Sequence, residues 1–279
     1  MRHSLCFVAA TLVAACVAAE AGADLVGSDI TLSNDSRFLS INTGSGAATL
    51  VGIDMGSVAP DVRGLAYDRN TDTFYGVDQI KDNLVKINRM TGAATTVGSL
   101  VNSQVPRGLA FDPNANKLYL TDTAADLLFT VNTTTGEATQ FINDLGFDKV
   151  NGLAFDANTN TLYGSDTTSN QLITISTATG EGTAVGSLEF DVVVGLAFDA
   201  NSNTLYGSDI DTDQLITIDT ATGEGTAVGS LGFQNVEGLA FAVPEPSSFV
   251  LAGVVGMLFP VGYACKRWGL LRHPTQPGR

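Results

Sequence analysis

A short motif, Gly-Leu-Ala followed by an aromatic residue, recurs five times in this chain and constrains its fold more than any other feature. The spacings between copies are 44, 44, 43 and 43 residues. The copies begin at Gly64, Gly108, Gly152, Gly195 and Gly238. Repeats of this length that contain only strand signals are typical of the four-stranded blades of a β-propeller.

One copy, residues 152 to 190, shows the internal pattern of the repeat. It reads Gly-Leu-Ala-Phe-Asp, Thr-Leu-Tyr-Gly-Ser-Asp, Gln-Leu-Ile-Thr-Ile-Ser and Thr-Ala-Val-Gly-Ser-Leu, with Asn- and Gly-containing turns between the segments. These segments predict four short strands, here named a to d. Strand c is apolar enough to be covered on both faces. Gly and Ala in strand a would allow innermost strands to approach closely around a central channel.

The repeats at the two ends of this region are incomplete in a complementary way. The segment from Asp24 matches strands b, c and d but has no strand a, whereas 238–242 is a strand a with nothing after it. Placing the last strand in the first blade gives five complete blades and leaves no unpaired edge. The sequence therefore predicts an all-β fold, a five-bladed β-propeller over residues 24–242.

A second recurring pattern in this region is a tyrosine followed shortly by an aspartate. The pairs are Tyr75 with Asp78, Tyr119 with Asp122, Tyr163 with Asp166, and Tyr206 with Asp209. This pattern resembles the Tyr-Trp-Thr-Asp and NHL-type propeller repeats. It departs from them in having Gly or Leu in place of the tryptophan and five copies where those families usually have six blades. The resemblance implies an architecture, and fold alone does not give function.

The N-terminus has the pattern of a secretory signal peptide over residues 1–23. An apolar run follows Arg2, and Ala21-Gly22-Ala23 is a small-residue cleavage site that would leave Asp24 first. An alternative is a lipoprotein signal, in which Cys16 of Val-Ala-Ala-Cys would be acylated.

The C-terminal segment, residues 243–279, predicts a membrane span. Residues 249–265 carry no charge and reach the lower length limit of a transmembrane helix. The basic residues that follow would remain cytoplasmic and place the preceding domain outside. The sequence Pro244-Glu245-Pro246, the apolar span and the basic tail together resemble the PEP-CTERM sorting signal. That resemblance implies export, an exosortase-type processing partner and a link to extracellular polysaccharide.

Composition excludes several functions for residues 24–243. This region holds 27 acidic and 9 basic residues, so we expect it to repel nucleic acid. Every cysteine and histidine lies in the terminal segments, which excludes an internal disulfide, Ser-His-Asp and Cys-His catalysis, and zinc sites built on those ligands. Glycoside cleavage by two carboxylates remains open, but nearly every acid occupies a repeated position.

The end of strand b carries the most regular acids, and two roles are open for them. They could form a calcium site, since this ion prefers oxygen ligands, or each could cap the turn that follows it. Repetition in every blade favours the structural role. These residues are Asp29, Asp78, Asp122, Asp166 and Asp209.

Variation between the copies offers the best candidate for a binding face. The residue before each Gly-Leu-Ala differs between blades, and we expect one side of this rim to be basic and the opposite side acidic or neutral. The rim residues are Arg63, Arg107, Asn151, Val194 and Glu237. The sequence thus favours a non-catalytic surface or matrix protein that binds a polysaccharide or a protein. A carbohydrate-active or lactonase-like hydrolase and a structural spacer are the alternatives.

Overall fold

The computed structural model describes residues 24–31, 33, 35–52 and 54–242. The predicted signal peptide (1–23) and the predicted sorting segment (243–279), with its span at 249–265, lie outside these residues. Within the described part, no helix has the length and apolarity that crossing a bilayer requires.

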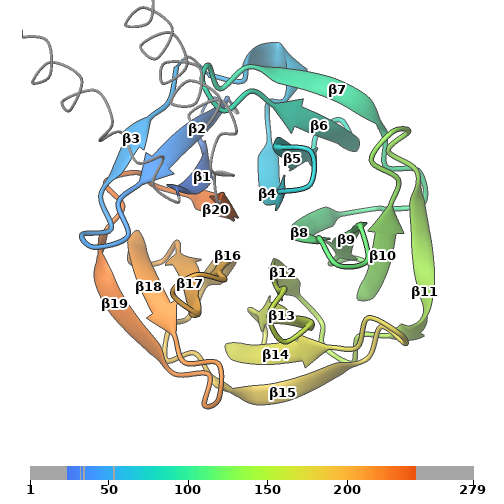
Figure 1. The fold of residues 1–279 in the computed structure, drawn as a ribbon, viewed down its shortest axis with the longest axis vertical. Helices are drawn as coiled ribbons and strands as arrows, with labels where there is room; N and C mark the ends of the chain where they lie inside the picture. Colours follow the sequence, from blue (N-terminus) through green and yellow to red (C-terminus); the bar gives the residue numbers. More distant parts are fainter. Residues whose placement is uncertain (1–23, 32, 34, 53, 243–279) are drawn as a thin grey trace, which may run out of the picture. The chain divides into compact units, whose positions relative to one another are not determined.

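The described residues form five antiparallel four-stranded sheets, arranged as blades around a centre (Figure 1). Each blade is given below from its innermost to its outermost strand. Blade 1 consists of β20 (Val236–Ala242), β1 (Asp24–Ile30), β2 (Ser36–Ile41) and β3 (Ala48–Leu50). Blade 2 consists of β4 (Val62–Asp68), β5 (Thr73–Asp78), β6 (Asn83–Ile87) and β7 (Ala94–Ser99). Blade 3 consists of β8 (Pro106–Asp112), β9 (Lys117–Asp122), β10 (Leu127–Val131) and β11 (Ala138–Asp144). Blade 4 consists of β12 (Val150–Asp156), β13 (Thr161–Asp166), β14 (Gln171–Ile175) and β15 (Gly182–Ser187). Blade 5 consists of β16 (Val193–Asp199), β17 (Thr204–Asp209), β18 (Gln214–Ile218) and β19 (Gly225–Ser230).

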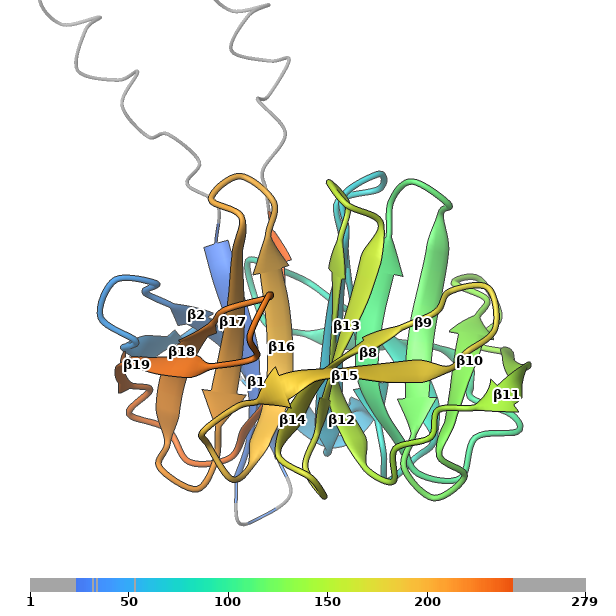
Figure 2. The same cartoon turned by 90° about the horizontal axis from the view of Figure 1, so that it is seen from below.

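Blade 1 is built from both ends of the described chain, which confirms the predicted ring closure. Strand β20 pairs antiparallel with β1, and Asp24 lies opposite Ala242 in the register. Both ends therefore lie at one face of the ring, here called the terminus face. In the side view, blue β1 begins and red β20 ends at the same edge (Figure 2). The innermost strands begin at the opposite face, here called the rim face.

The hydrophobic core lies between neighbouring blades. In strand β14, Leu172 and Ile173 are both fully buried. Leu172 packs in a cluster with Val193 of blade 5, whereas Ile173 packs with Tyr119 of blade 3. The two faces of this strand thus contact different neighbours, as predicted for strand c, and their burial is the main favourable term in folding.

Two glycine motifs of the repeat permit close contact between blades. A Cβ atom on Gly64 would lie 2.1 Å from the carbonyl oxygen of Arg107 in the next innermost strand. At the outer edge, a Cβ atom on Gly98 would lie 1.9 Å from the carbonyl oxygen of Thr135. Because any larger residue would collide with backbone at these points, the glycines set the distance between blades. The Thr-Gly turns thus also serve as contacts between blades.

Candidate functional site at the channel rim

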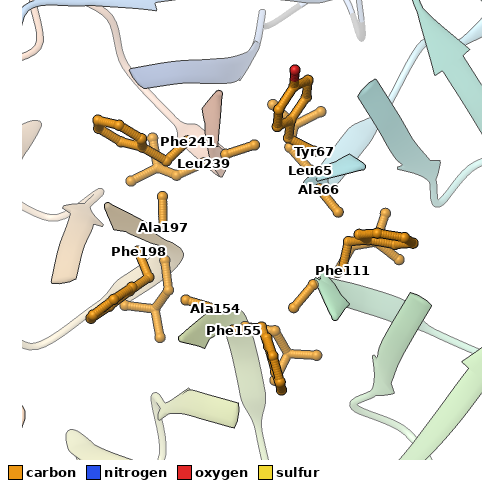
Figure 3. A pocket seen from close by; sticks show the side chains of 15 residues that line it. Leu65, Ala66, Tyr67, Phe111, Ala154, Phe155, Ala197, Phe198, Leu239 and Phe241 are labelled. Atoms are coloured by element: carbon orange, nitrogen blue, oxygen red, sulfur yellow. The ribbon is translucent and has the colours of Figure 1, made fainter. Parts of the chain in front are cut away.

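The central channel itself is narrow. It is lined by the Leu-Ala-aromatic segments of all five innermost strands and encloses about 60 Å³ (Figure 3). A water molecule takes about 30 Å³ of liquid volume, so this space suits a few waters and no larger ligand. A ligand of useful size would therefore bind at the end of the channel.

The five predicted rim residues are extra residues in β-bulges. The strand register shifts between Val150 and Gly152, so that Asn151 has no opposite partner in β13. The same shift occurs at the equivalent place in each blade. A bulge turns the extra side chain out of the ladder, and such bulges recur beside functional sites. The structure therefore brings Arg63, Arg107, Asn151, Val194 and Glu237 to one end of the channel.

The charges on this rim are paired, which corrects the predicted arrangement. Glu237 accepts from both arginines, with its Oε1 2.5 Å from Arg63 Nη1 and its Oε2 3.1 Å from Arg107 Nη1. Arg63 Nε lies 2.9 Å from Asp61 Oδ1. The basic and acidic residues were expected on opposite sides, but ring closure makes blade 1 the neighbour of blade 2. The result is a row of side chains with alternating charge, in the order Asp61, Arg63, Glu237 and Arg107.

The charged side chains in this row are not equally well neutralised by their neighbours. Burial raises the pKa of Glu237, against the opposing effect of both arginines. Burial alone would lower the pKa of Arg63, but the charges of Glu237 and Asp61 raise it overall. The pKa of Arg107 is lowered by burial and by repulsion from Arg63. The Nε atoms of both arginines are buried without a hydrogen-bond partner, but Arg63 lies beside two carboxylates and Arg107 beside one, so Arg107 is the less compensated cation.

The remaining rim residues are neutral. Asn151 donates from Nδ2 to the hydroxyl of Thr167 at 2.7 Å, and Val194 is 8% exposed. One part of the rim therefore carries two guanidinium groups and two carboxylates, and the other part carries an amide and an apolar side chain. Equivalent bulges in the five blades thus place chemically different side chains around one opening.

The five aspartates at the end of strand b do not converge on a common point. In the part of the chain that the structure describes, no three acidic, histidine or cysteine side chains gather as metal ligands would. Asp122 shows what these residues do instead: it accepts from the backbone N–H groups of Gln104, Val105, Ala124 and Ala125 and from the Ser103 hydroxyl. Burial acts to raise the pKa of Asp122, but these donors outweigh it and lower the pKa.

The other aspartates of this set follow the same plan, with one exception. Asp166 and Asp209 accept backbone N–H groups from the turn after strand b and from the loop before strand a. Asp78 accepts from Ile80. Asp29 instead forms an ion pair with Arg37. The geometry favours turn capping over the calcium site proposed for Asp29, Asp78, Asp122, Asp166 and Asp209.

Two features of the rim were not predicted from the sequence. The first is a hydroxyl in strand b that accepts the N–H of the bulge glycine: Ser165 for Gly152 at 3.1 Å, and Thr121 for Gly108 at 2.9 Å. A Ser or Thr directly before the repeated aspartate is the sequence signal for it. The second is Asp61, which precedes β4 and has no counterpart elsewhere in the repeat pattern.

The fold and this rim define a repeat protein of the five-bladed β-propeller class. A family model described as a repeat of unknown function (DUF6923) matches residues 28–227. The chain belongs to the DUF6923 family. A comparison with curated proteins finds no match.

Two solved structures are similar to this chain in fold. A chain in a crystal structure of a nidogen/laminin complex aligns with a TM-score of 0.57 and 16% identity, over 80% of this chain and 99% of that one. A structural-genomics protein of unknown function from Bacteroides thetaiotaomicron aligns with a TM-score of 0.50 and 19% identity, over 70% of this chain and 52% of that one. At these identities the likeness concerns the fold alone.

Proposed function

We propose that this chain is an exported, non-catalytic binding module displayed at a cell surface or in the extracellular matrix. Its ligand, a polysaccharide or a surface protein, docks at the rim face. The observation that carries the proposal is the bulge rim, where Arg63 and Arg107 share Glu237 and Arg107 keeps an unpartnered donor. Guanidinium groups held by carboxylates are well suited to directional hydrogen bonding with a ligand.

The topology supports a display role. Asp24 and Ala242 lie together at the terminus face, so a sorting segment joined to Ala242 continues from the face opposite the rim. We propose that residues 243–279 direct export through an exosortase-type enzyme and hold the domain at the membrane before or instead of release.

The positions of the acids support a non-catalytic role. Their most regular set is occupied by backbone N–H groups of neighbouring turns, as for Asp166 and Asp209. Glycoside cleavage needs two free carboxyl groups at a defined separation across a substrate. The buried rim acid Glu237 is instead held by two arginines.

The sorting proposal is tested by the intact mass of the native protein recovered from its own cells. We expect a product that starts at Asp24 and ends near 244–246. A product that retains Arg279 would instead indicate a permanently anchored propeller and would remove the main support for a matrix role.

The binding proposal is tested with extracellular polysaccharide and surface protein prepared from the same cells. We expect the protein to bind one of these fractions, and Arg63→Ala with Arg107→Ala to weaken that binding at least tenfold. The double variant Arg69→Ala with Lys117→Ala, at exposed positions just after β4 and at the start of β9 on the terminus face, serves as the charge-matched control. Equal binding by the rim variant and the control would contradict the rim as the site, and measurable hydrolysis would contradict the non-catalytic role.

A further inference from the structure

A second pocket lies on the rim face at the junction of blades 5 and 1. It has a volume of about 560 Å³, within the usual range for sites that hold small ligands. Its walls come from the loop between β1 and β2 and from the loop that leads into β20. The lining includes Asp29, Arg37, Phe233, Gln234 and Asn235.

The repeat is broken at this pocket in two ways. Seven residues separate the paired residues Asp29 and Arg37, whereas four separate Asp78 and Asn83 at the equivalent place in blade 2. The position of Arg37 is occupied in the other blades by neutral residues: Asn83, Leu127, Gln171 and Gln214. Blade packing does not require an arginine here, because four blades fold without one.

The arginine is held rigidly by two neighbours. Its Nε donates to Asp29 Oδ2 at 2.7 Å, and its guanidinium carbon lies 5.0 Å from the centre of the Phe233 ring. Such a cation–π contact, together with a carboxylate, fixes the orientation of the guanidinium plane. Asp29 is fully buried, and its Oδ1 has no hydrogen-bond partner. Its counterparts Asp166 and Asp209 use both oxygens for hydrogen bonds, whereas Asp78, like Asp29, has one buried oxygen without a partner.

The chemistry of the pocket selects a class of ligand. The charges of Asp29 and Arg37 cancel, and the nearby charge of Asp213 acts on Asp29. A polyanion is disfavoured by this balance and by the acidic domain around it. The pocket offers a partly exposed aromatic ring, an oriented guanidinium and the amides of Gln234 and Asn235. An apolar face with planar donors and acceptors around it matches a molecule with an apolar face and hydroxyl groups at its edge.

We propose that this pocket binds one neutral sugar unit of an oligosaccharide. One face of the Phe233 ring carries the Arg37 guanidinium and the ring packs against the core, so its exposed edge contacts the C–H surface of the sugar. The free edge of Arg37 and the neighbouring amides donate to the sugar hydroxyl groups. This inference rests on the proposed binding function but concerns a different site from the charged rim.

The test is a titration of the full chain with neutral hexose tetrasaccharides and with hexuronate tetrasaccharides of the same length. We expect saturable binding of a neutral ligand and at least tenfold weaker binding by Phe233→Ala. In the double variant Asp29→Asn with Arg37→Gln, Arg37→Gln gives blade 1 the glutamine found in blades 4 and 5. Asp29→Asn removes the carboxylate charge that would otherwise be buried without its arginine, so a fold defect is not expected. We expect it to lose binding to the same extent.

The matched control is Phe190→Ala, at the equivalent loop position before β16, where the facing residue of blade 5 is Gln214. It should bind the sugar as the parent protein does. Failure of every neutral tetrasaccharide to bind, equal binding by all variants, or preference for hexuronate would overturn the inference. Lys117→Ala, at the start of β9 on the terminus face, should also bind the sugar as the parent does. Binding of the extracellular fractions by Arg63→Ala with Arg107→Ala is scored separately, so failure at this pocket and failure at the rim are distinguishable.

Discussion

Replacement of Asp122 by alanine tests whether the repeated aspartates are structural caps. The carboxylate joins two segments that enclose the rim, because it accepts from Val105 N at 3.1 Å and from Ala124 N at 2.9 Å. Hydrogen bonds to a charged group contribute about 1.5–3 kcal/mol each, and loss of a capping side chain costs about 0.5–2 kcal/mol. Since the loop donors of Ser103 and Gln104 are partly exposed and water can replace the carboxylate there, we expect a total loss of about 2–3 kcal/mol.

The assay is thermal and chemical unfolding of the variant and its parent. For a domain of this size, each kcal/mol shifts Tm by about 2–4 °C, so the expected decrease is about 4–12 °C. The control is Asp144→Ala, an exposed aspartate with a single capping bond to Gly146 N at 2.8 Å. It should lose less than about 1 kcal/mol.

The same variant makes a pH prediction whose sign follows from the lowered pKa of Asp122. An acid with a depressed pKa in the folded state stabilises the fold above its unfolded pKa of about 3.9 and loses that contribution as pH falls through the folded pKa. The difference between parent and alanine variant should therefore shrink below about pH 4. A decrease in Tm below about 1 °C, a difference that is independent of pH, or a calcium-dependent rise in Tm of the parent would refute the capping role.

Three further perturbations test the rim, the contacts between blades and the core. Glu237→Gln leaves Arg63 and Arg107 without their shared carboxylate and should be less stable than the parent in urea unfolding. Because burial raises the pKa of Glu237, the parent loses stability as pH rises above the unfolded pKa of about 4.3, so the deficit of the variant should shrink over that range. Gly98→Ala should cost about 1–3 kcal/mol, because the new Cβ meets the carbonyl oxygen of Thr135 at 1.9 Å. Gly44→Ala, whose nearest contact is 3.5 Å away, should be nearly neutral by the same unfolding assay. Leu172→Ala should cost about 2–5 kcal/mol, since this side chain is fully buried between two blades; a loss under about 1 kcal/mol would contradict that packing.

The repeat was sufficient to predict the blades and the ring closure, because both follow from local patterns and their count. Strand order, the pairing of β20 with β1 and the close approach at Gly64 are confirmed. The neutral part of the rim, Asn151 and Val194, agrees with the prediction, but the place of Glu237 was predicted wrongly for a physical reason. Glu237 is the last rim residue in the sequence, but closure of the ring places it beside Arg63. Their charged groups lie 2.5 Å apart and form an ion pair.

The pocket at blades 5 and 1 could not be predicted from the repeat for a similar reason. Arg37 and Phe233 are nearly the length of the domain apart in sequence, and they meet only because the ring closes between their blades. The sequence does contain two separate signals of this pocket. One is an arginine at a position where the other copies of the repeat have a neutral residue, and the other is a longer loop after strand b of the first copy. Neither signal identifies a partner until the three-dimensional neighbour is known.

Repetition and deviation therefore have different physical roles in this chain. A residue present in every blade is used by every blade, as with the capping aspartates and the glycines between blades, and a ligand gains little access to it. Deviations are tolerated where a side chain leaves the ladder, which happens at the bulges and in the loops of the rim face. The charged bulge residues and the Arg37 pocket both lie on that face, opposite Asp24 and Ala242. A fold whose blade packing does not depend on its rim loops can change a ligand there without losing stability, and this is why we propose recognition on the rim face.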